Sequence, residues 1–386
     1  MKNHTKTTID RLRNFLRLAM AIRKPVHILS NPGLGKTQEV TAFAAEAKAD
    51  LFVLVASLLD RLDLAGLPRY SKLKFGDKEV EATTFAPMET IVRLSNEYNP
   101  TGGPAVLYFN EFNAAPESVM PVLYRLVCER RINDLSLRDN VMIVADGNPS
   151  SAMSAGRDLQ MAMRRRFMWV TLDVAVEPWN TWAYGHGIDG RVIAFFKVPA
   201  FLKHFCDFDP AKAREVVTYS CPASWENLST ALQGLDDLSA GGTVLSEEDR
   251  LVLYTGLVGQ SAGTAFHGFL KFQDKIPNVH KALENPDAFK LPEGVEMRAL
   301  LVGSILNLVR KNLALVPAAA TIAHRMFKAG QGHTEYGVFL LRSMASIPLV
   351  SAKVTGTPAF KAMAVALTKE SELLGALLAA PAKPTP

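Results

Sequence analysis

The chain has 386 residues, of which 48% are hydrophobic and 21% are charged, and its formal net charge at pH 7 is +5. This length predicts two or three domains, and the composition is that of an ordinary globular protein. The mild, scattered positive charge is compatible with a nucleic-acid partner but does not indicate one, and three widely spaced cysteines argue against both a disulfide framework and a zinc site.

The sequence also bears on the expected location. Residues 1–13 mix charged and polar side chains and lack the apolar centre of a secretion signal. No stretch reaches the roughly 18 uncharged apolar residues that a membrane span needs. The odd number of cysteines suits a reducing compartment. We therefore expect a cytoplasmic protein that has no membrane-bound part.

Helix and strand patterns alternate over the first 175 residues. Apolar and alanine-rich periodicity predicts helices at 8–23, 37–47 and 116–131. Short, almost continuously apolar runs predict buried strands at 26–29, 51–56, 105–109, 141–145 and 167–174. This alternation predicts an α/β fold, with a parallel sheet that helices cover on both faces.

Strand patterns fade from residue 176 onward, and helical periodicity continues to the end. A linker is predicted at 274–277, where proline and charged residues interrupt the pattern. We therefore expect an α/β core at 1–175, a helical domain at 176–275 and a helical C-terminal extension at 276–386. The proline-rich stretch 380–386 predicts a disordered tail.

A glycine-rich turn follows the first predicted strand of the core. Residues 30–37 read Ser-Asn-Pro-Gly-Leu-Gly-Lys-Thr. Between a strand and a helix, such a turn offers backbone N–H groups and a helix N-terminus to an anion, with Lys36 as the cation and Thr37 as a hydroxyl ligand for Mg²⁺. An ordinary surface turn is the alternative. We predict a binding loop for the phosphates of ATP, formed by Asn31, Pro32, Gly33, Leu34, Gly35, Lys36, Thr37 and Gln38.

Polar residues also end two later strands. Asn110 and Glu111 follow the strand 105–109. In a nucleotide-hydrolysing sheet this strand end carries an acid for the metal, followed by a carboxylate that orients and deprotonates the attacking water. Glu111 has the second position. Asn110 has the first, so it can face the metal through its oxygen but lacks the charge, and we expect weakened metal binding.

Asn148 follows the strand 141–145 and is predicted to hold the attacking water, although Asn148-Pro149 by itself indicates only a turn. Three arginines stand at 164–166, after an apolar helical stretch. They form either a solvated or nucleic-acid-binding patch, or an arginine finger that stabilises charge on the γ-phosphate. We predict the finger, with Arg166 acting on a neighbouring subunit and Arg165 as its helper.

Taken in order, these features resemble the MoxR group of AAA+ ATPases. The resemblance covers roughly residues 8–270 and includes the phosphate loop, residues 63–68 (Asp-Leu-Ala-Gly-Leu-Pro), residues 110–116, Asn148-Pro149, Arg166-Phe167, Trp179, Trp182 and residues 221–225. It implies an AAA+ P-loop core followed by an α-helical lid, and a hexameric ring that binds nucleotide between subunits. It also implies remodelling or activation of a partner protein, which often carries a von Willebrand factor A domain.

The chain departs from the family pattern at three positions. Ser30 stands where glycine is usual, which predicts either ordinary backbone angles or some strain. Asn110 replaces the aspartate, and Ala223 replaces an arginine of the lid. These departures leave open, beside the remodelling ATPase, a nucleotide-gated scaffold with little hydrolysis. A DNA-associated AAA+ motor also stays open, because related AAA+ rings act on DNA and the pI is about 9. Residues 59–88 resemble the insert that lines the ring's opening, and a flexible surface loop is the alternative there.

Overall fold

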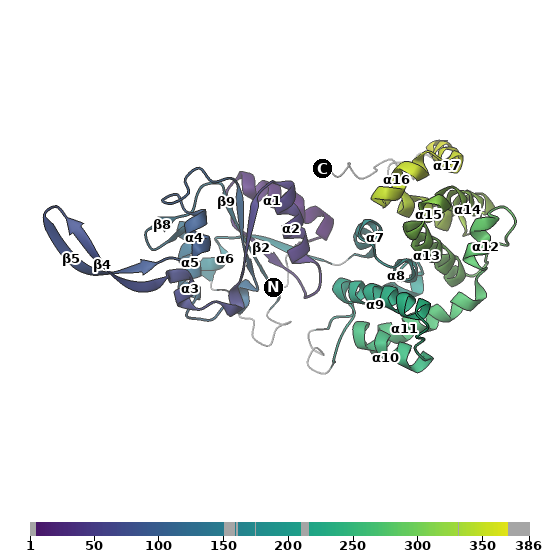
Figure 1. The fold of residues 1–386 in the computed structure, drawn as a ribbon, viewed down its shortest axis with the longest axis horizontal. Helices are drawn as coiled ribbons and strands as arrows, with labels where there is room; N and C mark the ends of the chain where they lie inside the picture. The colour runs from purple at the N-terminus through teal and green to yellow at the C-terminus, as the bar shows by residue number, and fades with distance from the viewer. Residues whose placement is uncertain are drawn as a thin grey trace. The chain divides into compact units, whose positions relative to one another are not determined.

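The computed structural model describes residues 5–149, 159, 161–173, 175–209, 216–330 and 332–369. The chain forms two compact units (Figure 1). Unit 1 comprises residues 1–174 with 209–213 and contains all the strands of the described part, whereas unit 2 comprises residues 175–208 with 214–386 and is helical. The predicted tail at 380–386 lies outside the described residues.

Unit 1 is built on a six-stranded parallel sheet in the order β1-β10-β2-β9-β6-β3. Its strands are β1 (Lys6–Thr7), β2 (Val26–Leu29), β3 (Asp50–Val55), β6 (Ala105–Asn110), β9 (Val141–Gly147) and β10 (Met168–Leu172). The next strands of this sheet along the chain, β3, β6 and β9, lie on one side of β2, and β10, which comes after them, lies on the other side. The carboxyl end of β2 is therefore a topological switch point, where open α/β sheets bind ligands.

Helices cover both faces of this sheet. On one face, α1 (Ile9–Ala21) and α2 (Lys36–Glu46) pack their apolar residues against Val106, Tyr108 and Val144 of the strands. On the other face, Leu107, Phe109 and Ile143 pack against α3 (Arg61–Ala65), α4 (Glu89–Leu94), α5 (Met120–Glu129) and α6 (Met161–Arg164). The predicted fold class, a parallel α/β core followed by helices, is confirmed.

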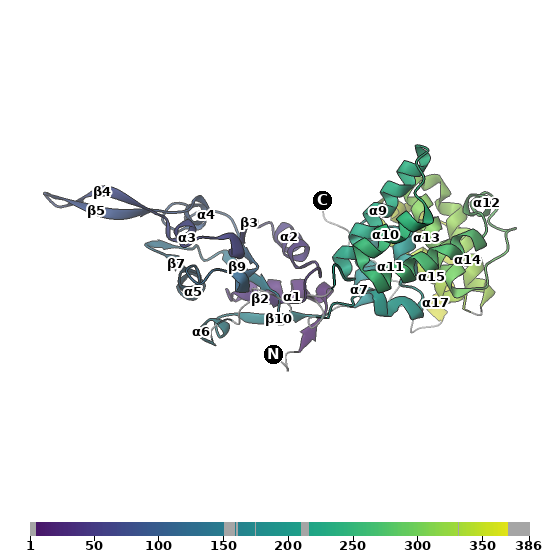
Figure 2. The same cartoon turned by 90° about the horizontal axis from the view of Figure 1, so that it is seen from below.

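Two small antiparallel sheets complete unit 1. One pairs β7 (Arg131–Ile132) with β8 (Leu135–Ser136), and the other is a long hairpin of β4 (Leu67–Phe75) and β5 (Lys78–Ala86). The hairpin projects from the rest of unit 1 in both views (Figures 1 and 2). Its register places Lys72 opposite Glu81, an arrangement of unlike charges that stabilises strand pairs. A role at the opening of a ring stays a prediction.

Unit 2 is a packed array of helices around an aromatic core. The helices are α7 (Val176–Gly185), α8 (Gly190–Phe195), α9 (Pro222–Ala240), α10 (Glu247–Val258), α11 (Gln260–Leu270), α12 (Val279–Glu284), α13 (Val295–Lys311), α14 (Val316–Ala329), α15 (Thr334–Ser346), α16 (Pro348–Thr355) and α17 (Pro358–Lys369). Trp225 is fully buried in this core, and its indole N–H donates to the carbonyls of His204 and Phe205 at 3.2 and 3.1 Å. The predicted division of this part at residue 275 stays a prediction.

None of the helices in the described ranges has both the length and the apolar character needed to cross a membrane.

Candidate nucleotide-binding site

The predicted phosphate loop connects β2 to α2. Gly33 and Gly35 have φ angles of 75° and 80°, a left-handed conformation that glycine adopts at little cost. No described side chain caps the start of α2, so its first backbone N–H groups face the loop without a partner from the helix. An uncapped helix N-terminus after such a turn suits a phosphate group. Ser30 is buried, and its φ lies outside the left-handed region. Of the two predicted possibilities, ordinary backbone angles or some strain, Ser30 therefore has the ordinary angles.

Lys36 lies at the centre of this site. Its ammonium group donates to Asn148 Oδ1 at 2.8 Å, to Ser30 Oγ at 3.0 Å and to the Ser30 carbonyl at 3.4 Å. Burial lowers the pKa of Lys36, and the nearby carboxylates of Asp146 and Glu111 oppose that shift. The structure thus brings the predicted cation of the loop into contact with Asn148, at the end of β9.

Glu111 follows β6 directly and has φ 56°, in the left-handed region. Its side chain is exposed, and Oε2 accepts a hydrogen bond from Ser57 Oγ at 2.6 Å. Asn110 is the last residue of β6 and is half-buried. These two residues therefore occupy the end of the strand next to β9, as the sequence predicts.

Asp146 is a buried acid of this site that no sequence motif identifies. Its side chain is in β9 and is 1% exposed. Oδ2 accepts a hydrogen bond from the Tyr108 hydroxyl at 2.7 Å, and Oδ1 accepts one from the Glu111 backbone N–H at 2.8 Å. The Tyr108 hydroxyl also lies 3.3 Å from Thr37 Oγ1. Burial raises the pKa of the Asp146 carboxyl, while the charge of Lys36 and both hydrogen bonds oppose the rise.

A close contact fixes the end of β9. Asn113 donates from Nδ2 to the Asn148 carbonyl at 2.6 Å. A Cβ at Gly147 would lie only 2.1 Å from Asn113 Oδ1, so a larger residue at this position would displace Asn113. Gly147 also accepts a hydrogen bond from the Ser30 backbone N–H at 3.3 Å, which ties β9 to the start of the loop. Asn148 is thereby held at a defined place beside Lys36.

The oxygen groups at this edge suit Mg²⁺. Mg²⁺ usually binds one or two protein oxygens, keeps several waters and takes its other ligands from substrate phosphates. Thr37 offers a hydroxyl, Asn110 an amide oxygen and Asp146 a nearby carboxylate. Within the described ranges, no group of three or more His, Cys, Asp or Glu side chains is placed to hold a metal ion.

The remaining predicted residues, Arg165, Arg166 and Ala223, belong to other elements of the chain. Arg165 and Arg166 follow α6 and are exposed, whereas Arg164 donates from Nε to the Leu159 carbonyl at 2.6 Å. Ala223 lies in the first turn of α9, in unit 2. The predicted roles of Arg165 and Arg166 need a second subunit, so they stay predictions.

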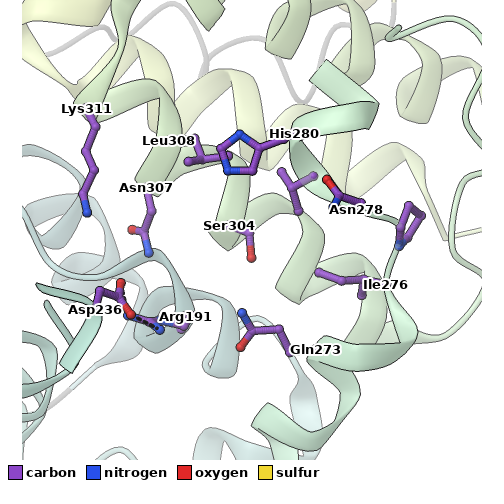
Figure 3. Close-up of a pocket in the computed structure, with 12 residues that line it drawn as sticks. Arg191, Asp236, Gln273, Ile276, Asn278, His280, Ser304, Asn307, Leu308 and Lys311 are labelled. Atoms are coloured by element: carbon purple, nitrogen blue, oxygen red, sulfur yellow. Dashed lines mark hydrogen bonds and ion pairs between the residues drawn. The ribbon is translucent and has the colours of Figure 1, made fainter. Parts of the chain in front are cut away.

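Unit 2 contains a separate cavity of about 460 Å³, bordered by α8, α9 and α13 (Figure 3). Arg191 lines it, but its guanidinium already donates to Asp189 and Asp236 at 2.8 to 3.0 Å. The charge of Arg191 is therefore neutralised by carboxylates. The cavity brings together no set of groups comparable to the one around Lys36.

Comparison with known proteins leads to solved structures alone. No protein-family model and no curated protein matches the chain. Among the similar structures is the Thermotoga maritima RuvB Holliday junction branch migration motor, at 14% identity over 77% of this chain and 80% of that one, with a TM-score of 0.32. A putative ATPase from Cytophaga hutchinsonii is similar at 14% identity over 82% and 76% of the two chains, with a TM-score of 0.30. Values this low carry no conclusion about function, which has to come from the site itself.

Proposed function

We propose that the chain is an AAA+ ATPase of MoxR type, which binds ATP with Mg²⁺ at the loop between β2 and α2 and hydrolyses it to remodel or activate a partner protein. One observation carries the proposal. Lys36, Asn148, Asp146 and Glu111 gather at the carboxyl edge of a parallel sheet, beside the uncapped start of α2. A cation, an amide, two carboxylates and the N–H groups of a helix N-terminus together match the needs of a nucleoside triphosphate.

In this proposal, residues 31–38 hold the phosphates through their backbone N–H groups. Lys36 exchanges its present hydrogen bonds to Ser30 and Asn148 for bonds to phosphate oxygens. Thr37 and Asn110 would hold Mg²⁺, which would supply positive charge to stabilise the negative charge that develops on the phosphates.

Hydrolysis then requires an activated water. Glu111 is exposed at the strand end, where its carboxylate can orient a water and accept its proton. Asn148, fixed by Asn113 and Gly147, holds this water from the other side. Arg166 of a neighbouring subunit, with Arg165 as helper, stabilises the charge on the γ-phosphate.

The proposal extends to assembly and location. The resemblance to MoxR proteins supports a homo-oligomeric, hexameric ring and a protein client, for example one with a von Willebrand factor A domain. All three cysteines, Cys128, Cys206 and Cys221, are free thiols, which supports a reducing, cytoplasmic location.

The test measures ATP binding and turnover of the full chain beside three variants. Lys36→Ala is expected to lose ATP binding, because the positive charge on the phosphates is gone. Glu111→Gln should bind ATP but turn it over about 100-fold or more slowly, because the general base is absent. Glu129→Gln, which changes a surface glutamate paired with Arg125, serves as the matched control and should behave as wild type. Equal turnover in all four proteins would contradict hydrolysis at this site.

A nucleotide-gated scaffold is the second candidate function. The Glu111 carboxylate is bound by Ser57 at 2.6 Å, which restrains the group that would act as base. Asn110 and Ala223 also favour little hydrolysis. The same assay separates the two functions, because a scaffold would bind ATP through Lys36 and show equally low turnover with and without the Glu111→Gln change.

A further inference from the structure

We propose that Asp146 supplies from β9 the negative charge that Asn110 lacks at the end of β6, so that the acid of the Mg²⁺ site has moved to the neighbouring strand. The inference rests on the proposed ATP site and assigns to it a residue that no motif identifies. Asp146 is a positioning residue in this arrangement, because it acts on the metal through Thr37 and bound water.

The register of the sheet places the two residues side by side. Ala145 of β9 pairs with Phe109 of β6, so the next residues, Asp146 and Asn110, lie at the same level of the sheet. On its other side Asp146 pairs with Ile28 of β2, the strand that leads into the phosphate loop. The carboxylate is therefore one strand nearer to the loop than a residue at position 110.

Strand alternation also orients Asp146 toward α2. Side chains two residues apart share one face of a strand, and Val144 packs in the same cluster as Val40 and Phe43 of α2. Asp146 thus lies on the α2 face, above Val144 and beside Tyr108. This is the face on which Lys36 and Thr37 begin the helix.

The contacts of Asp146 connect it to each part of the proposed chemistry. Tyr108 bridges its Oδ2 to the Thr37 hydroxyl, with O···O distances of 2.7 and 3.3 Å. Its Oδ1 fixes the backbone of Glu111 in the left-handed conformation. Lys36 provides the nearby positive charge. A carboxylate that is 1% exposed is costly to fold unless charges and donors compensate it, and here the compensating groups belong to the site.

The test measures ATP affinity by calorimetry on the full chain, with and without Mg²⁺. In the wild type, Mg²⁺ is expected to raise the affinity for ATP. Asp146→Asn keeps the size and much of the hydrogen bonding of the side chain, and it should reduce this Mg²⁺-dependent gain about 10- to 100-fold, as loss of a group behind a metal ligand typically does. Affinity without Mg²⁺ should stay equal or rise, because a negative charge near the phosphates is removed.

A rescue variant separates the charge from a purely structural role. Asp146→Asn combined with Asn110→Asp returns the carboxylate to the end of β6 and should restore the Mg²⁺-dependent gain. The matched control is Asp139→Asn, which removes an exposed aspartate from the loop before β9 and should leave the gain unchanged. Tyr108→Phe removes only the bridging hydroxyl and should lower the Mg²⁺-dependent gain several-fold. It tests the same connection if Asp146→Asn folds poorly.

The outcomes are distinguishable. A wild-type Mg²⁺-dependent gain in both Asp146→Asn and Tyr108→Phe overturns the inference and leaves the ATP site standing. A reduced gain that Asn110→Asp does not restore assigns Asp146 a structural role only, which also overturns it. A wild-type chain that binds no ATP under either condition removes the proposed function itself.

Discussion

His27 lies in β2, directly below the phosphate loop, and its imidazole is buried among aromatic rings. It stacks on Trp169 at 4.2 Å between ring centres and meets the edges of Phe112 and Phe167. Neither ring nitrogen has a hydrogen-bond partner among the described residues. Burial, assisted by the positive charge of Lys36, lowers the pKa of His27 to about 3. The imidazole is therefore neutral in the folded protein.

This burial predicts a pH-dependent stability. Between pH 6.5 and 3 the unfolded chain protonates His27 while the folded chain does not, so the free energy of unfolding falls as the pH falls, by about 1.4 kcal/mol per pH unit. His27→Leu removes this contribution. Between pH 7 and pH 5, the wild type should therefore lose about 2 kcal/mol more of its free energy of unfolding than the variant does. Urea unfolding at the two pH values measures it, and an identical pH dependence in both proteins would contradict the burial of a neutral imidazole.

In unit 2, helices α8 and α13 approach each other closely at two glycines. A Cβ on Gly303 of α13 would lie 2.3 Å from the Gly190 carbonyl of α8. Gly303→Ala must therefore separate the helices, and we expect a loss of about 1–3 kcal/mol. Gly268→Ala in α11 is the control, because no described atom lies within 4 Å of a Cβ there, and it should stabilise the helix by up to about 1 kcal/mol. Three of the four tryptophans, Trp179, Trp182 and Trp225, lie in unit 2, so tryptophan fluorescence during urea unfolding follows this unit most strongly. Equal losses in both variants would refute this explanation.

At the level of elements, hydrophobic periodicity in the sequence predicts most helices and strands of the α/β core. The helix expected at 8–23 and the strand at 26–29 correspond to α1 and β2, because one apolar face or a fully apolar run marks a buried element. The hairpin β4–β5 was not predicted as strands. Its exposed faces carry charged residues such as Lys74 and Glu79, so no apolar alternation distinguishes it from a polar loop. The helix expected from 116 begins only at Met120, after a turn that starts at Pro116.

The candidate site was predictable only where a motif assigns a residue to a position. The loop, Glu111 and Asn148 follow from the order of strand ends along the chain. Asp146 stands in the same strand end as Asn148, and the loss of charge at Asn110 was the signal that could have directed attention to it. Its place beside Asn110 depends on the register of β6 and β9, which sequence spacing does not define.

At the scale of the whole molecule, each active site of the proposed ring contains residues from two subunits. Arg166 is exposed after α6, as a residue that reaches into a neighbour must be. Loss of an arginine finger typically costs about 10³- to 10⁵-fold in turnover, so Arg166→Ala should be nearly inactive. Lys36→Ala should be inactive because its own loop cannot bind ATP.

Mixing the two inactive variants tests whether the arginine acts across an interface. In rings assembled at random from equal amounts, about a quarter of the interfaces pair an intact loop with an intact Arg166, so turnover should recover to about a quarter of the wild-type value. Lys36→Ala mixed with Glu111→Gln is the control and should show no recovery, because both changes impair the same side of the interface. If the first mixture also stays inactive although the subunits co-assemble, Arg166 does not complete the site of a neighbour, and each subunit would have to hydrolyse ATP with its own residues.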